Sequence, residues 1–245
     1  MATLGFDTAT AILTVAVADG REVLAEGTRT PGSDGRPRHS PLLLLEVERC
    51  VEGAGGWSRI DRLAVGVGPG SYTGLRIGIS TARALAQARG LEITGVSTLS
   101  ALAMGVFSRE TTGGSPGSGG QATRAPLPVL DARRGQTFVQ VHDPRAEPRG
   151  EPLVLGPEEL CELAATVAPK PLAAGDGALR FRAELESVGV EVPEDRDPVH
   201  SVQARHVCVL GEMADAAPAE TIEPLYLREP DAKRWLKRDE RTDTG

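Results

Sequence analysis

Residues 66–78 have the sequence GVGPGSYTGLRIG, and this stretch decides how the first part of the chain folds. The residues that lead into it, RLAVGVG, form a short apolar run that predicts a buried strand. A proline and a glycine follow at 69–70 and allow the chain to turn sharply at low steric cost. Ser71 or Thr73 can then cap a helix, which Gly90 is well placed to end.

The same stretch raises the question of a phosphate site, because glycine-rich loops ahead of helices often hold phosphates. No lysine follows as in the GxxxxGK[ST] pattern, so this is not a Walker loop. Gly74 and Gly78 lie one helical turn apart, which indicates a close approach of another backbone. We therefore expect a turn that presents a small-residue helix. The weak anion or nucleotide candidates are Asp7, Thr8, Gly70 and Ser71.

Two helices of this region have apolar residues beyond one face. In the helix 75–89, the larger face consists of Leu75, Gly78, Ile79, Ala82, Leu85 and Ala86, and the smaller face of Ile77, Thr81, Ala84 and Ala88. An earlier helix, with Ser40 as N-cap and Pro41 at its first position, has an apolar arc of Leu43, Leu44, Val47, Cys50 and Val51. Leu42 and Leu45 fall outside this arc, among Glu46, Glu48, Arg49 and Glu52. Burial within this chain and a helix–helix subunit interface both explain the pattern.

The rest of the pattern predicts an α/β protein of two related lobes. Strands at 3–7, 11–18 and 22–28 open the fold as an antiparallel meander, and 126–143 is expected to form two strands joined by a tight turn. Helices are expected at 156–168, at 178–189 and near 199–215. Strands that end in Asp7 and in Asp131 each precede a second strand, which indicates a duplicated unit. The expected first lobe, with the pairing helices, spans 1–108, and a flexible Gly/Ser-rich segment follows at 109–124. The second lobe is expected at 125–200. A C-terminal helix and segment (201–228) should pack back toward the first lobe, and a charged tail follows at 229–245.

Composition limits the classes of protein. The chain has 245 residues, of which 40% are hydrophobic and 25% charged, as in a soluble globular protein. The net charge of -7 gives the chain as a whole no attraction for nucleic acid. No apolar run approaches the roughly 20 residues of a membrane span, and no secretory signal is evident, so we expect a cytoplasmic location. Three widely spaced cysteines are expected to be buried thiols.

Five motifs occur in order: DTAT at 7–10, GPGSYTGLRIGISTARALA at 68–86, GVSTL at 95–99, LDAR at 130–133 and PLYLRE at 224–229. Together they resemble the TsaB (YeaZ) family, and the run at 68–86 is the most specific of them. The resemblance implies an actin-like (ASKHA, ribonuclease-H-like) fold with two duplicated lobes. It also implies a non-catalytic relative of TsaD that serves in making threonylcarbamoyladenosine at position 37 of tRNAs that decode codons beginning with A.

The resemblance further implies partners. Members of the family pair with the catalytic subunit TsaD through first-lobe helices, work with the ATPase TsaE, and can pair with themselves through the same helices. The expected interface residues are Leu42, Leu45, Arg49, Ile77, Thr81, Ala84 and Ala88. Contact with tRNA is expected to be indirect or weak. Arg133, Arg134 or the basic tail residues Lys233, Arg234, Lys237 and Arg238 could reach phosphates, although a solvated tail is the simpler interpretation.

No metal, cofactor or catalytic residue is expected. TsaD-like enzymes carry an HxxxH pair on the first long helix, whereas here Leu43 stands four residues after His39. His142, His200 and His206 do not complete a one-face helical pair. No serine lies in a GxSxG motif, so a peptidase has no support.

A free-standing nucleotide-dependent phosphotransferase of the same fold is the alternative to a scaffold subunit. Asp7 and Asp131 fit by position the strand-end aspartates that hold metal-nucleotide through water in such enzymes. Against this, two arginines follow Asp131 in place of a glycine-rich turn, and Gln136 and Phe138 stand where the family usually has an acidic and an aromatic residue. The AAGDGA segment, with Gly175 and Gly177, is a weak candidate for an adenosine loop.

Overall fold

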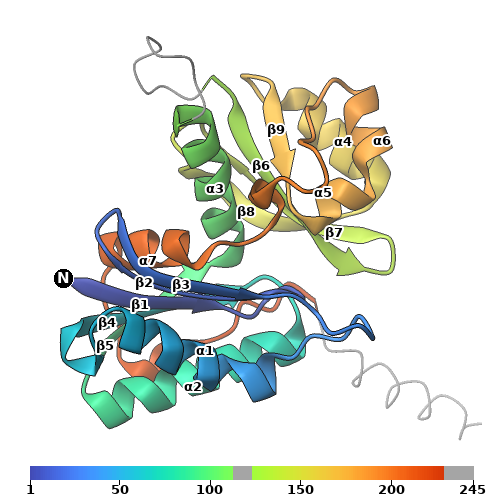
Figure 1. The fold of residues 1–245 in the computed structure, drawn as a ribbon. Coiled ribbons are helices and arrows are strands. Elements are labelled where there is room, and N and C mark those ends of the chain that lie inside the picture. Colours follow the sequence, from blue (N-terminus) through green and yellow to red (C-terminus); the bar gives the residue numbers. More distant parts are fainter. Residues whose placement is uncertain (113–122, 229–245) are drawn as a thin grey trace, which may run out of the picture.

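A computed structural model describes residues 1–112 and 123–228 of the chain (Figure 1). The first lobe consists of β1 (Ala2–Asp7), β2 (Leu13–Asp19), β3 (Glu22–Arg29), α1 (His39–Gly53), β4 (Ile60–Gly68), α2 (Tyr72–Arg89) and β5 (Glu92–Ser97). The second consists of β6 (Ala125–Arg133), β7 (Gln136–His142), β8 (Pro148–Leu155), α4 (Pro157–Thr166), β9 (Pro171–Ala174), α5 (Asp176–Arg180) and α6 (Arg182–Ser187). Helix α3 (Thr98–Thr112) connects the lobes, and α7 (Ala204–Met213) returns to the first.

The two sheets repeat one topology. The first has the order β3-β2-β1-β4-β5, in which β1, β2 and β3 are antiparallel neighbours and β4 runs parallel to β1. The second has the order β8-β7-β6-β9, with β6, β7 and β8 antiparallel and β9 parallel to β6. Asp7 ends β1, and Asp131 lies near the end of β6. This correspondence confirms the predicted α/β fold with duplicated lobes.

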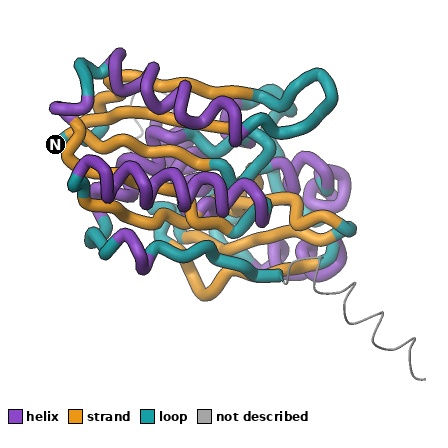
Figure 2. The backbone as a smooth tube through the Cα atoms, turned by 90° about the horizontal axis from the view of Figure 1, so that it is seen from below, coloured by secondary structure: helices purple, strands orange, loops and turns teal. Residues whose placement is uncertain are grey.

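Helices cover both faces of the first sheet. Helices α1 and α2 pack side by side on one face, and α7 packs on the other (Figures 1 and 2). The α7 side depends on small residues, because a Cβ on Gly5 would come within 2.7 Å of the Cys208 sulfur. The core under α1 and α2 is instead built of large apolar side chains, including Leu4, Phe6, Leu43, Leu63, Leu75 and Ile79.

A second apolar cluster joins the lobes. It includes Val96, Leu99 and Leu102 from β5 and α3, Leu130 and Phe138 from β6 and β7, and Val207 from α7. Because these side chains are buried together, the two sheets share a core as well as a connecting helix. Among the described residues, no helix combines the length and apolar character required to cross a membrane.

The predicted turn into α2 is confirmed in its caps. The Ser71 side chain accepts a hydrogen bond from the Gly74 N–H at 3.3 Å, and Gly90 ends the helix with a φ of 65°. The start of α1 was predicted wrongly. The helix begins at His39, and its N-cap is Arg38, which makes no side-chain capping hydrogen bond, so Ser40 and Pro41 lie inside the first turn.

The helical arc of α1 also needs two corrections. Leu44, assigned to the buried arc, is 53% exposed. Glu46, assigned to the polar side, is buried and forms ion pairs with Arg29 at 2.6 Å and Arg49 at 2.9 Å. The buried face of α1 therefore includes Glu46, whose carboxylate is paired with Arg29 of β3. The periodicity of apolar residues does not predict this, because a carboxylate can be buried when it is paired.

Other elements of the structure also differ from the predicted ones. Strand β8 was not predicted, because it includes two prolines and a glycine; it forms the edge of the second sheet. The expected helix at 178–189 divides into α5 and α6, and the expected helix near 199–215 is only α7 after a short 3-10 turn at Pro198–His200. Helix α3 extends to Thr112. Most of the predicted flexible segment (113–122) and the charged tail (229–245), with its four basic candidates, lie outside the described residues.

Candidate functional site

The glycines of the opening motif make room for the end of β1. A Cβ on Gly66 would come closer than 3.0 Å to Asp7, and one on Gly70 would come closer than 3.0 Å to Ala9. Gly74 and Gly78 stand in the same relation to Thr8. Side chains at these four positions would therefore displace the turn that follows β1. The four-residue glycine spacing serves packing between this turn, the 69–70 loop and α2.

Asp7 is fully buried, and other groups of the chain satisfy its carboxylate. One oxygen accepts a hydrogen bond from the Ala9 N–H at 2.7 Å, and the other accepts one from the Thr98 hydroxyl at 2.9 Å. The Thr98 oxygen in turn accepts a hydrogen bond from the Gly68 N–H at 3.2 Å. Burial raises the pKa of Asp7 above the ordinary value for an aspartate, while the hydrogen bonds oppose this shift.

Thr8 is equally committed to the fold. Its buried hydroxyl donates a hydrogen bond to the Gly74 carbonyl at 2.8 Å. The Ser71 N–H donates to the Ala9 carbonyl at 2.7 Å, so the loop before α2 is bonded to the turn after β1. Of the four nucleotide candidates, Asp7 and Thr8 are therefore sealed inside the lobe. Gly70 and Ser71 line the surface of a cleft.

This cleft lies between the lobes and has a volume of about 300 Å³. Residues of the first lobe, the second lobe and the C-terminal segment line it, including Ser71, Thr73, Phe138, Asp176, Tyr226 and Arg228. Asp131 lines this cleft, whereas Asp7 is buried away from it. The Asp131 carboxylate accepts hydrogen bonds from the Arg133 N–H and the Arg180 guanidinium, both at 2.9 Å. The strand-end aspartates of the two lobes are thus not brought together as a pair that shares one open site.

The turn after Asp131 has an unusual backbone. Arg133 and Arg134 have φ values of 65° and 54°, in the left-handed region that residues other than glycine rarely adopt. The sequence has arginines here in place of a glycine-rich turn, yet the backbone adopts a conformation that glycine favours. The Arg133 side chain is largely exposed beside the cleft.

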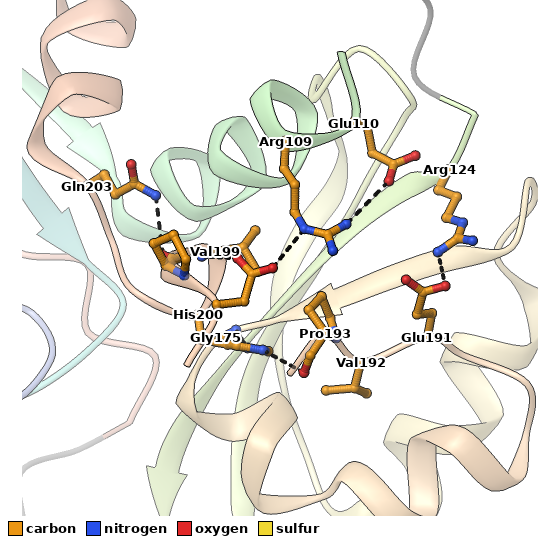
Figure 3. Close-up of polar contacts among 12 residues, drawn as sticks. Arg109, Glu110, Arg124, Gly175, Glu191, Val192, Pro193, Val199, His200 and Gln203 are labelled. Atoms are coloured by element: carbon orange, nitrogen blue, oxygen red, sulfur yellow. Dashed lines mark hydrogen bonds and ion pairs between the residues drawn. The ribbon is translucent and has the colours of Figure 1, made fainter. Parts of the chain in front are cut away.

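Gly175 and Gly177, the adenosine-loop candidates, are packing residues. A Cβ on either would come closer than 3.0 Å to the backbone of β6. Nearby, the His200 ring accepts a hydrogen bond from the Gly175 N–H at 3.2 Å through Nδ1 and contacts the Pro193 carbonyl at 3.0 Å through Nε2 (Figure 3). Arg109 of α3 pairs with Asp197 at 2.9 Å, so these contacts fasten the segment after α6 to α3 and β9.

The remaining histidines, His39, His142 and His206, do not pair with one another. His39 Nε2 contacts the Thr10 carbonyl at 2.8 Å, and His142 Nε2 contacts the Ser100 hydroxyl at 3.5 Å. Burial lowers the pKa values of His142 and His206 to about 4, so both rings are neutral at physiological pH. Within residues 1–112 and 123–228, no three His, Cys, Asp or Glu side chains are grouped so that they could hold a metal ion.

A second concave surface, of about 500 Å³, lies between α1 and α2. We call it the α1–α2 groove. Its lining residues are Ser40, Leu43, Leu44, Tyr72, Thr73, Arg76, Ile77, Ser80 and Thr81. Five of the exposed large apolar side chains lie on these helices or on the C-terminal segment: Leu44, Leu45, Tyr72, Leu225 and Tyr226. This is a surface on which apolar side chains remain uncovered within the described part of the chain.

The predicted interface residues are distributed unevenly around the groove. Ile77 and Thr81 line it, and Leu45, Ala84 and Ala88 are exposed on the same two helices. Leu42 packs partly against the core. Arg49 is ion-paired with Glu46 and also donates to the Glu26 carbonyl at 3.3 Å, so its guanidinium serves the contact between α1 and β3.

Leu44 and Tyr72 are groove residues that the sequence pattern did not predict. Leu44 was placed on the wrong side of the helix. Tyr72 could have been found, because an aromatic residue in the first turn of a helix otherwise rich in small residues is unusual in a chain with only two tyrosines. The second tyrosine, Tyr226, stacks on it with ring centroids 4.9 Å apart.

The two-sheet topology is that of actin-like proteins, and comparison with solved structures agrees. The structure of YeaZ from Pseudomonas aeruginosa superposes with a TM-score of 0.71 at 23% sequence identity, over 92% of this chain and all of that one (100%). A family model described as "TsaD: tRNA N6-adenosine threonylcarbamoyltransferase" matches residues 34–176, more than half of the chain.

Sequence relatives point to one branch of this class. An uncharacterized protein of Mycobacterium tuberculosis (strain H37Rv) is 31% identical over 230 residues, which cover 94% of this chain and 93% of that protein. The tRNA threonylcarbamoyladenosine biosynthesis protein TsaB of Escherichia coli (strain K12) is 35% identical over 140 residues, which cover 56% of this chain and 53% of that protein. The chain belongs to the TsaB (YeaZ) family.

Proposed function

We propose that this protein is a non-catalytic scaffold subunit in the synthesis of N6-threonylcarbamoyladenosine at position 37 of tRNAs that decode ANN codons. In this proposal it pairs with a TsaD-like catalytic subunit and supports its active conformation, together with a TsaE-like ATPase. Relatives named as tRNA threonylcarbamoyladenosine biosynthesis proteins support the reaction. The observation that carries the scaffold role is the uncovered apolar surface around the α1–α2 groove.

The chemistry of the groove indicates what a partner would supply. Leu44 and Ile77 offer apolar contact, while Ser40, Thr73 and Thr81 leave room for close approach. Arg76 lies at the same groove and would favour an acidic group on the partner. A helix with an apolar ridge and a nearby carboxylate fits these properties. The same surface would serve a homodimer in the absence of the catalytic subunit.

Two features support the absence of catalysis by this chain. Asp7 and Thr8 are sealed and hydrogen-bonded within the lobe, so they offer no groups to a metal-bound phosphate in this conformation. Asp131 forms ion pairs with Arg133 and Arg180 at the cleft. A free-standing phosphotransferase would need both strand-end carboxylates to face one ligand.

Affinity purification from the native cell tests the assignment. We expect a tagged chain to recover the TsaD-like and TsaE-like proteins. A reconstituted tRNA-modification reaction that contains the TsaD-like and TsaE-like subunits should form the modified nucleoside only when this chain is included. Modification at an undiminished rate without this chain would contradict the scaffold role.

A further inference from the structure

Residues 217–228, which we call the C-terminal strap, cross from the first lobe to the second. The Ala217 N–H donates to the Ile93 carbonyl at 2.9 Å, which ties the start of the strap to β5. Arg83 of α2 donates to the carbonyls of Glu220 at 2.8 Å and Ile222 at 2.7 Å. Because these hydrogen bonds use main-chain carbonyls, they hold the strap along α2 independently of the strap's side chains.

The end of the strap is bonded to both lobes. The Leu225 N–H donates to the Val67 carbonyl of β4 at 2.7 Å. Leu227 packs against the apolar cluster between the lobes. The Arg228 guanidinium donates to the Ala132 carbonyl of β6. The segment that presents Tyr226 is thus fixed on both sides of that residue.

Tyr226 meets the first residue of α2. Its ring stacks on Tyr72 with centroids 4.9 Å apart and an angle of 29° between the ring planes. Arg76, one helical turn later, donates to the Tyr72 hydroxyl at 2.8 Å, and its guanidinium carbon lies 5.1 Å from the Tyr72 ring centroid. The two rings remain 38% and 39% exposed for Tyr72 and Tyr226, so the stack lies at the surface.

Tyr72 belongs to two surfaces, and Tyr226 to one. Tyr72 lines both the cleft between the lobes and the α1–α2 groove, whereas Tyr226 lines the cleft and is absent from the groove lining. A partner seated in the groove would contact Tyr72 and Arg76 but not Tyr226. Tyr226 would then act on such a partner through Tyr72, the residue that the two surfaces share.

We propose that the strap is a positioning element for the α1–α2 groove, and that Tyr226 holds Tyr72 and Arg76 in the arrangement a partner subunit recognises. This inference rests on the proposed function of the groove as the docking surface. A surface tyrosine without a stacking partner rotates among several rotamers, and that freedom is lost when a partner binds. The strap removes that freedom before the partner arrives, so the free protein already has the shape that binds.

The experiment measures the dissociation constant of the purified full chain for the TsaD-like subunit, by calorimetry. Tyr226→Ala should weaken binding by roughly 3- to 10-fold, the cost of ordering one large side chain at the interface. Tyr226→Phe keeps the ring and should bind as the unchanged protein does. Tyr226→Leu keeps apolar bulk without the stack and should resemble Tyr226→Ala, which separates loss of stacking from loss of strap packing.

A double-mutant cycle distinguishes positioning from direct contact. If Tyr226 acts through Tyr72, then Tyr226→Ala adds no further loss in a Tyr72→Ala background. Amide hydrogen exchange of the free Tyr226→Ala protein should be faster in the first turn of α2. Additive losses, or unchanged affinity of both Tyr226→Ala and Tyr226→Leu, would overturn the inference.

Ile77→Glu separates failure of this inference from failure of the proposed function. Ile77 lines the groove itself, so its replacement tests the docking surface directly. If Ile77→Glu abolishes binding and the Tyr226 variants do not alter it, only the role of the strap fails. If Ile77→Glu binds normally, the groove is not the docking surface, and both proposals fail.

Discussion

The hydroxyl of Thr8 donates a hydrogen bond to the carbonyl oxygen of Gly74, and a Cβ on Gly74 would collide with the carbonyl oxygen of Thr8. The turn after β1 and the first turn of α2 therefore meet backbone to backbone. This relation accounts for the glycine at position 74 without any bound phosphate. It also explains why the aspartate that precedes the turn lies out of reach of solvent.

Gly74→Ala should destabilise the protein more than its single methyl group suggests. The obstacle is the backbone of residue 8, which cannot rotate away, so overpacking should lower the free energy of unfolding by about 1–3 kcal/mol. Gly105→Ala in α3 is the matched control, because no heavy atom lies within 4 Å of the added Cβ there. That change should be neutral or stabilise by up to about 1 kcal/mol. Urea unfolding of both variants checks this, and equal losses would count against the packing role.

Asp7→Asn should change how stability depends on pH. Because burial raises the native pKa of Asp7 above its ordinary 3.8, the native state keeps this proton to a higher pH than the unfolded state does. As pH rises through that interval, the native state binds more protons than the unfolded state, so the unfolding free energy falls. The stability of the unchanged protein relative to Asp7→Asn should therefore decline from acid toward neutral pH. Urea titrations at a series of pH values would contradict this if the difference rose instead.

Leu45→Glu and Ala84→Glu should each leave the fold intact and weaken pairing with the TsaD-like subunit. Both residues are exposed in the free protein, and an unpaired charge buried by a partner costs about 3–5 kcal/mol. Met213→Glu is the control. Met213 is about as exposed as Leu45, at 70% against 64%, but it lies at the end of α7, away from α1 and α2. Co-elution of a well-folded Leu45→Glu variant with the catalytic subunit would remove Leu45 from the interface.

Magnesium-ATP should give no saturable binding heat with the isolated chain at micromolar concentration. The reason is that Asp7 and Thr8 already use their oxygens within the lobe. Calorimetry on the unchanged protein and on Asp7→Ala decides the matter. Micromolar binding that disappears in Asp7→Ala would favour the phosphotransferase instead.

Much of the fold could be predicted from local sequence, because apolar periodicity and turn chemistry act over a few residues. Val47, Cys50 and Val51 were placed in the core of α1 for this reason, and they are buried. The same reasoning failed for Glu46, whose burial depends on a charge from Arg29 on another element. Periodicity cannot represent a polar residue that is stabilised by a distant partner.

The candidate site was harder to predict than the fold. The close approach at Gly74 and Gly78 was anticipated, but the residue that approaches, Thr8, is separated from Gly74 by 66 positions in sequence. The stack between Tyr72 and Tyr226 likewise joins the start of α2 to the C-terminal strap, which is distant in sequence. Both contacts depend on how strands and helices assemble, which residue spacing does not report.

The position of α7 has a consequence for synthesis on the ribosome. Strands β1 and β2 are made well before α7, the helix that covers one face of them and is completed only at Met213. One face of the sheet of the nascent first lobe therefore remains uncovered until the second lobe and α7 have been made. That face is built around small residues such as Gly5 and Ala16, which expose little apolar area during the delay and so limit its attraction for other unfinished chains or for chaperones.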